Sequence, residues 1–231
     1  MKDLYEKLIG LIPSYLDNFF GLISGPKRFV AESAFANEPA MEKALVFFAV
    51  SFVMSWILSI PLNRNDPFLE LGPDAIFVFI YVLAYGVALY AAWSIVGGRS
   101  GFKKLMTIYF YYTAILKLIF SLVFLSMMGA MRMVDPALYR DIFDAVHSGN
   151  LVIFLINNKE FLFKNTGYQL SMMVLIIGLS VMLAWIFIGW GAYRELNQLS
   201  RLRSTLAGLL FIMFCFPIAA LTFLIASSLV K

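Results

Sequence analysis

One apolar stretch of the sequence carries a stripe of polar side chains that could support chemistry. At four-residue spacing, the stripe comprises Tyr109, Thr113, Lys117 and Ser121. On a helix, this spacing places all four side chains on one face. A lysine at the centre of a membrane span costs about 2.5–3.5 kcal/mol to insert, and each Leu, Ile or Phe offsets roughly 0.3–0.6 kcal/mol of that. The span therefore still inserts, but the ammonium of Lys117 needs a partner, a cavity or the membrane interface.

Two interpretations of this polar stripe stay open on the sequence alone. In the first, the four side chains line a polar pocket or contact another subunit. In the second, Lys117 extends its ammonium to the interface, or the span lies in a different register along the chain.

The other residue patterns that could do chemistry are weak. The single histidine, His147, follows Asp141 and Asp144 and could form an acid–base or metal cluster, although the solvated face of an amphipathic helix explains the same residues. Residues 97–101 (GGRSG) lack the lysine of a phosphate-binding loop, so we expect a tight turn there. Zinc-protease, nucleophile-elbow and Rossmann patterns do not occur in the sequence. We therefore expect no enzymatic activity, no metal and no cofactor.

The composition indicates which class of protein positions these residues. Of the 231 residues, 61% are hydrophobic and only 14% are charged, against about 25% charged in soluble domains. The high hydrophobic content excludes a disordered chain. A soluble globule of this size cannot bury that much apolar surface, which excludes most water-soluble enzymes. The net charge of +4 does not indicate nucleic-acid binding, because the basic residues form no dense run. In a membrane protein such residues set the orientation instead.

Five segments are long and apolar enough to cross a bilayer, which takes about 20 helical residues. We therefore expect an all-α integral membrane protein with five transmembrane helices. The four tryptophans lie towards the ends of these spans, where interfacial aromatic residues are favoured. The expected spans are Ala44–Ile60, Ala75–Val96, Leu105–Met128, Gln169–Trp190 and Leu206–Leu229.

Residues 1–43 form an amphipathic N-terminal segment that precedes the five-span domain, residues 44–231. Pro13 is expected to divide this segment into two short helices. An apolar stripe beside charged residues suits a segment that lies flat at the level of the lipid headgroups. Packing of the same stripe on the membrane domain explains the pattern equally well. The stripe comprises Leu4, Leu8, Leu11, Tyr15, Phe19 and Leu22.

The lysines and arginines predict the orientation of the chain. With five spans, the termini lie on opposite sides, and the side of the N-terminus holds eleven of the eighteen basic residues. The positive-inside rule therefore places the N-terminus in the cytoplasm and the C-terminus outside. Some basic residues on the cytoplasmic side could meet anionic lipid or an acidic patch on a partner, although a purely topological role explains each of them. These are Arg28, Lys103, Lys104, Arg194, Arg201 and Arg203.

A long external loop, residues 129–168, separates the third and fourth spans. Asp135 followed by Pro136 is typical of a helix start, and Gly149 is typical of its end. Leu151–Ile156 is apolar but too short to cross the membrane. We expect that segment either to dip into the interface or to cover the membrane domain.

Three short motifs resemble the membrane domains of bacterial Yip-family (Ypt-interacting-protein) members. They are residues 25–29 (GPKRF) before the first span, residues 100–104 (SGFKK) before the third, and the basic connector at residues 193–203 after the fourth. The resemblance extends from about Leu22 to Leu229 and implies five spans with a cytoplasmic N-terminus. The aspartate-leucine-tyrosine-glycine-proline entry motif of eukaryotic members is missing, as is the proline often found in the third span. This departure argues against binding of Rab-type GTPases.

The resemblance implies a multi-pass protein of the bacterial inner membrane with a role in transport or membrane organisation. We expect a non-enzymatic accessory or scaffold protein that docks to another membrane system, such as an ABC-type transporter. The alternative is a small carrier or lipid-handling protein with a polar cavity near Lys117. Expected partners are membrane lipids and a membrane protein or transporter complex, not nucleic acid. Self-association stays open.

Overall fold

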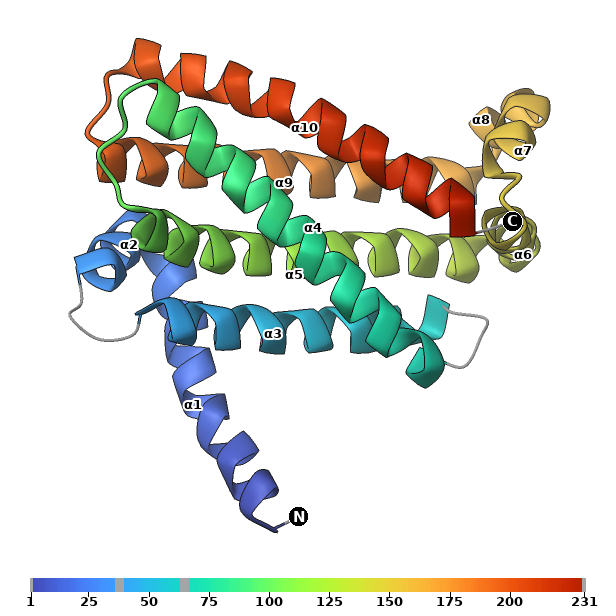
Figure 1. Cartoon of the computed structure of the whole chain (residues 1–231). Helices are drawn as coiled ribbons and strands as arrows, with labels where there is room; N and C mark the ends of the chain where they lie inside the picture. Colours follow the sequence, from blue (N-terminus) through green and yellow to red (C-terminus); the bar gives the residue numbers. More distant parts are fainter. Residues whose placement is uncertain (1, 36–39, 63–66, 230–231) are drawn as a thin grey trace. The chain divides into compact units, whose positions relative to one another are not determined.

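The computed structural model describes residues 2–35, 40–62 and 67–229, and every regular element in these ranges is a helix (Figure 1). The expected all-α membrane fold is therefore confirmed. The elements are α1 Lys2–Ser24, α2 Pro26–Phe35, α3 Ala40–Ser59, the short 3-10 turn η1 Ile60–Leu62, α4 Pro67–Ile95, α5 Phe102–Val134, α6 Pro136–His147, α7 Leu151–Asn157, α8 Lys159–Lys164, α9 Thr166–Asn197 and α10 Arg201–Leu229.

The five expected spans correspond to α3, α4, α5, α9 and α10, each of which is long and apolar enough to cross a membrane. The helices extend beyond the apolar stretches that mark them in the sequence. The clearest case is α5, whose 33 residues reach about 50 Å at 1.5 Å per residue, more than the roughly 30 Å of a hydrocarbon core. The polar ends of these helices therefore lie outside the hydrocarbon or the helices tilt.

The described residues group into two compact units. The first unit draws on Met1–Val50, Gly72–Ala114 and Phe187–Lys231, and its fully buried side chains include Phe47, Trp93 and Phe110. The second unit draws on Ser51–Leu71 and Ile115–Ile186. Its core comprises Met131, Leu138, Ile142 and Leu162.

The N-terminal segment is divided at a different place from the one that the sequence predicts. The prediction that Pro13 divides it is wrong, because α1 continues through that residue to Ser24. A proline inside a helix removes one hydrogen bond, but packing beyond it offsets the loss, since Tyr15 stacks on Phe47 with ring centroids 4.7 Å apart. The division falls at Gly25 instead, where Pro26 occupies the first position of α2, a position at which a missing N–H costs nothing.

The connection between α5 and α9 consists of three short helices, α6, α7 and α8. As predicted, Asp135 caps α6: its carboxylate accepts hydrogen bonds from the amides of Ala137 at 3.2 Å and Leu138 at 3.0 Å. The chain leaves α6 through Gly149, whose φ of 71° suits glycine. The apolar segment after it forms α7, which packs against the core of the second unit. The other apolar side chains of α7, Val152, Ile153 and Ile156, are exposed, so both expectations for this segment stay predictions.

The tryptophans are more buried than their positions along the chain predict. Trp93 is fully buried, and Trp56 and Trp185 are each only 8% exposed. Trp93 packs on Trp190 with ring centroids 4.9 Å apart. Their indoles therefore contribute to the helix packing rather than to an interfacial belt, because hydropathy locates the end of a span but not the direction in which a side chain points.

Candidate functional site

The predicted polar stripe lies on one face of a single helix, α5, and its first two residues belong to the first unit. Tyr109 is only 9% exposed, and its side chain hydrogen-bonds that of Thr113 one turn later. Gly86 of α4 lies directly against the Tyr109 ring, since a Cβ on that glycine would come within 3.0 Å of Cε1. This part of the stripe is therefore closed over by α4.

The other two residues of the stripe belong to the second unit, where they face α3. The hydroxyls of Ser121 and Ser55 share a hydrogen bond. The Lys117 ammonium lies 5.4 Å from the centroid of the Phe52 ring, a cation–π distance. Ser51 and Ser55, one turn apart on α3, are 0% and 2% exposed. We call Ser51, Ser55, Lys117 and Ser121 the polar seam.

The structure places Lys117 at the middle of its helix and against the part of α3 that belongs to the same unit. Lys117 is the sixteenth of the 33 residues of α5, so its central position in the span was predicted correctly. Its ammonium faces a ring of its own chain, which makes it part of a helix contact. The two α3 serines were missed, although two serines spaced by four in an apolar span are a readable signal of a polar face.

A second constellation joins two connections of the first unit at a buried asparagine. Asn197, at the end of α9, is 1% exposed. Its Oδ1 accepts hydrogen bonds from Ser100 Oγ at 2.6 Å and Ser100 N at 3.2 Å. Its Nδ2 donates to the carbonyl oxygen of Tyr193 at 2.9 Å. We call residues 97–101 and 197–200 the loop junction.

Both connections at the loop junction leave their helices through the same type of C-terminal turn. Gly97 has a φ of 89°, and the next amide, that of Gly98, donates to the carbonyl of Trp93 at 2.8 Å. Gln198 has a φ of 54°, and the amide of Leu199 donates to the carbonyl of Arg194 at 3.3 Å. This pairing is the Schellman motif, which ends helices sharply. The expected tight turn at residues 97–101 is thus confirmed.

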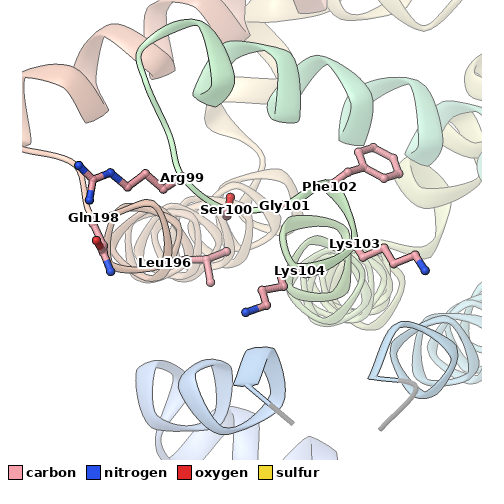
Figure 2. A pocket seen from close by; sticks show the side chains of 8 residues that line it. All are labelled: Arg99, Ser100, Gly101, Phe102, Lys103, Lys104, Leu196 and Gln198. Carbon is pink, nitrogen blue, oxygen red and sulfur yellow. The ribbon is translucent and has the colours of Figure 1, made fainter. Parts of the chain in front are cut away.

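An open depression of about 570 Å³ lies beside the loop junction. In Figure 2, Arg99 extends near Gln198, while Lys103 and Lys104 leave the first turn of α5 in different directions. Residues of α5 and α9 share this lining with the connection between α4 and α5. The lining residues are Arg99, Ser100, Gly101, Phe102, Lys103, Lys104, Leu196 and Gln198.

The remaining predicted basic residues differ in their surroundings. Arg28 is exposed and donates to Glu32 of the same helix at 2.8 Å. The guanidinium of Arg203 lies near Gly97, since a Cβ there would be 3.8 Å from Nη1. Arg201 is exposed and Arg194 is half-buried. We call Arg99, Lys103, Lys104, Arg194, Arg201 and Arg203 the basic face.

An ion pair joins α2 to α9 within the first unit. Lys27 Nζ lies 2.9 Å from Glu195 Oε1, and the lysine side chain passes close to Gly191. Both partners are about half exposed, so the pair contributes only about 0–1 kcal/mol. Its value is positional, because it holds the start of α2 beside the last turns of α9. Neither residue was predicted as a pair, since 168 positions separate them.

The histidine and the aspartates of the predicted cluster lie on the surface of α6. His147 Nδ1 lies 2.7 Å from the carbonyl oxygen of Phe143, and the two rings lie with centroids 4.1 Å apart. Asp141, Asp144 and His147 are all exposed. Within the described part of the chain, no group of three or more His, Cys, Asp or Glu side chains could hold a metal ion.

Comparison with known proteins adds no relative to this picture: no family model, curated protein or solved structure matches the sequence. The Yip-family resemblance therefore stays a prediction based on three short motifs. Two arrangements remain as candidates for function, the basic face around the loop junction and the polar seam.

Proposed function

We propose that this protein is a non-enzymatic accessory or scaffold protein that docks to another membrane system through its basic face. One observation carries the proposal. Lys103 and Lys104 occupy the first turn of α5, and Arg201 and Arg203 occupy the first turn of α10, with no acidic residue in either turn. The positive end of the helix dipole opposes each of these charges by about 0.3–1 kcal/mol. These charges lower the stability of their own helices, so their proposed role is to contact a partner.

The loop junction supports docking because it fixes the backbone that carries these charges. Asn197 joins the connection before α5 to the connection before α10 by hydrogen bonds to Ser100. A backbone that is already ordered loses less entropy when a partner binds. The complementary partner is a membrane protein with an acidic surface at the level of the headgroups. The Yip-family resemblance suggests a transport system, such as an ABC-type transporter.

The basic residues also support the proposed orientation. The connections that carry the basic face lie on the same side of the membrane as the N-terminus, because two and four spans separate them from it. The excess of Lys and Arg on that side favours the cytoplasm. The proposed location is the bacterial inner membrane, with the C-terminus in the periplasm.

Co-purification from native membranes in mild detergent tests the proposal. The variant Lys103→Gln/Lys104→Gln/Arg201→Gln/Arg203→Gln removes the four opposed charges without introducing new ones. The matched control, Lys159→Gln/Lys164→Gln, removes charges from the exposed surface of α8. We expect the first variant to lose its co-purifying membrane protein and the control to retain it. Equal recovery of the same partner by both variants would contradict the proposal.

A second candidate function, a carrier or lipid-handling protein, is favoured by the polar seam. The seam places a lysine and three serines in the apolar parts of α3 and α5, where polar side chains often mark a substrate path. Uptake of a labelled lipid or small solute by proteoliposomes, compared between wild type and Ser55→Ala/Ser121→Ala, tests it. Transport that depends on the seam and not on the basic face would favour the carrier.

A further inference from the structure

Between Ile12 and Ser24, the part of α1 whose side chains the structure describes, the helix has one packed and one exposed apolar flank. The packed flank includes Tyr15, which is 8% exposed, and Leu22, which is fully buried. The second flank is exposed, with Ile12 at 53%, Leu16 at 42% and Ile23 at 48%.

Tyr15 and Leu22 belong to the apolar stripe that the sequence predicts, while the side chains of Leu4, Leu8 and Leu11 lie outside the described part of the structure. The sequence analysis did not predict the exposed flank as a separate surface. It lies beside the packed flank on the helix, so both belong to one continuous hydrophobic pattern in the sequence.

The contact between α1 and α3 sets the depth of α1 in the membrane. Tyr15 stacks on Phe47 with ring centroids 4.7 Å apart. Figure 1 shows that α1 crosses α3 near the first turns of α3. Phe47 lies four positions beyond Lys43, the last charged residue at the start of α3, which corresponds to about 6 Å along the helix. The apolar part of α3 after Lys43, residues 44–59, covers about 24 Å, most of a hydrocarbon core. The contact therefore lies at the level of the lipid acyl chains.

The polar residues of α1 fix which way the helix is rotated. Ser14 and Asn18 line a hollow of about 260 Å³ together with Glu42 and Lys43, which belong to the first turn of α3. This is the end of α3 that meets water. Asp17, on the same side of the helix, is exposed.

The exposed flank points in the opposite direction. At 100° per residue, Ile12, Leu16 and Ile23 fall within an arc of about 40° centred opposite Ser14. Phe20, 62% exposed, borders this arc. A helix that turns its polar residues to the water side at this depth must turn this flank towards the middle of the bilayer.

We infer that α1 is embedded in one leaflet of the bilayer, with Ile12, Leu16, Phe20 and Ile23 among the lipid acyl chains. The occupant of the exposed flank is lipid, and neither a second copy of the chain nor another protein covers it. Lys27 and Arg28 follow directly, with exposed side chains, and cations at this level favour anionic headgroups. The inference is independent of the proposed docking function, because it concerns a different helix surface.

Fluorescence quenching in the full-length protein tests this inference. Single cysteines replace Leu16 or Asp17 in a Cys215→Ser background, and each carries an environment-sensitive dye. The protein is reconstituted into vesicles of phosphatidylcholine and phosphatidylglycerol. We expect brominated acyl chains to quench the dye at Leu16→Cys and aqueous iodide to leave it unchanged. The matched control, Asp17→Cys, should show the reverse pattern.

Two outcomes would overturn the inference. Iodide quenching at Leu16→Cys equal to that at Asp17→Cys would place the flank in water. Protection of Leu16→Cys from both quenchers, lost when the protein is diluted with lipid, would show that a second copy covers the flank. An Ile23→Cys variant repeats the measurement in case Leu16→Cys fails to fold, and the same criteria apply to it.

Discussion

Asn197 and Ser100 are 97 residues apart in the chain, yet one carbonyl oxygen of the asparagine accepts both hydrogen bonds that Ser100 can donate. Burial makes this relationship important, because Asn197 is 1% exposed. A buried polar group that loses its partner costs about 1–3 kcal/mol. The loop junction therefore depends on this asparagine more than on any charged residue near it.

Replacing Asn197 with Ala should lower the melting temperature in detergent. The change leaves the Ser100 amide and hydroxyl without their acceptor, which corresponds to about 1–3 kcal/mol. Asn150 provides the control because it is exposed and its side chain donates a long hydrogen bond, 3.4 Å, to Ser148; Asn150→Ala should shift the melting temperature little. Equal shifts in the two variants would show that the junction does not contribute to stability.

Gly98→Ala should destabilise the protein, whereas Gly101→Ala should not. A Cβ at Gly98 would lie 2.5 Å from Asn197 Oδ1 and 2.7 Å from the backbone oxygen of Trp93, while a Cβ at Gly101 would meet nothing within 4 Å. Overpacking of this kind costs about 1–3 kcal/mol, and an open surface position changes stability by less than about 0.5 kcal/mol. Thermal unfolding of both variants in one detergent measures the difference. A stable Gly98→Ala protein would mean that the turn can move away from Asn197.

The variant Lys117→Met distinguishes a structural role of this lysine from a functional one. Methionine retains much of the volume and can contact the Phe52 ring through its sulfur, so we expect the melting temperature to stay unchanged or to rise. Insertion should become easier by about 3 kcal/mol. If the charge serves function, partner recovery or transport should fall. A lower melting temperature with unchanged association would identify Lys117 as an internal structural contact.

The Asp135 cap predicts that the stability of the start of α6 depends on pH. Hydrogen bonds from the Leu138 amide and from Asn165 Nδ2 lower the pKa of the Asp135 carboxyl. A carboxyl whose pKa is lower in the folded than in the unfolded state stabilises the fold above the unfolded pKa. That stability is lost as the pH falls through the folded pKa. We expect hydrogen exchange at the start of α6 to accelerate in acid.

Asp135→Asn provides the control for this pH dependence. Asparagine is an equally good helix cap but does not titrate. The exchange rate at the start of α6 should therefore lose its acid-induced increase in this variant. If the increase persists, another group causes it.

Cysteine labelling tests the orientation at two exposed positions, Gln198 and His147. In a Cys215→Ser background, Gln198→Cys should react only from the cytoplasmic side and His147→Cys only from the periplasmic side. Reaction of both from one side would contradict the arrangement of five spans. Gly98 and Asn197 are unsuitable for labelling, because the first has no room for a side chain and the second is buried.

The sequence predicts the features of this protein that depend on local patterns. Hydropathy locates all five spans, and the cap at Asp135 follows from two adjacent residues. The sequence does not predict features that depend on contacts between residues far apart in the chain. Asn197 belongs to a polar connector with no periodicity, so nothing in the sequence marks its bond to Ser100. The error at Pro13 has the same origin, since propensity favours a break there and a contact with a residue on α3 outweighs it.

The bond between Ser100 and Asn197 imposes an order on the synthesis of the protein. When α4 and α5 leave the ribosome, the asparagine that holds their connection has not yet been made. The connection that carries Arg99 and leads into Lys103 and Lys104 at the start of α5 is therefore untethered while these helices are inserted. Only after α9 has been inserted can the same loop become fixed. Asn197 thus acts late in biogenesis, and its loss should affect the finished protein without changing the direction in which the spans insert.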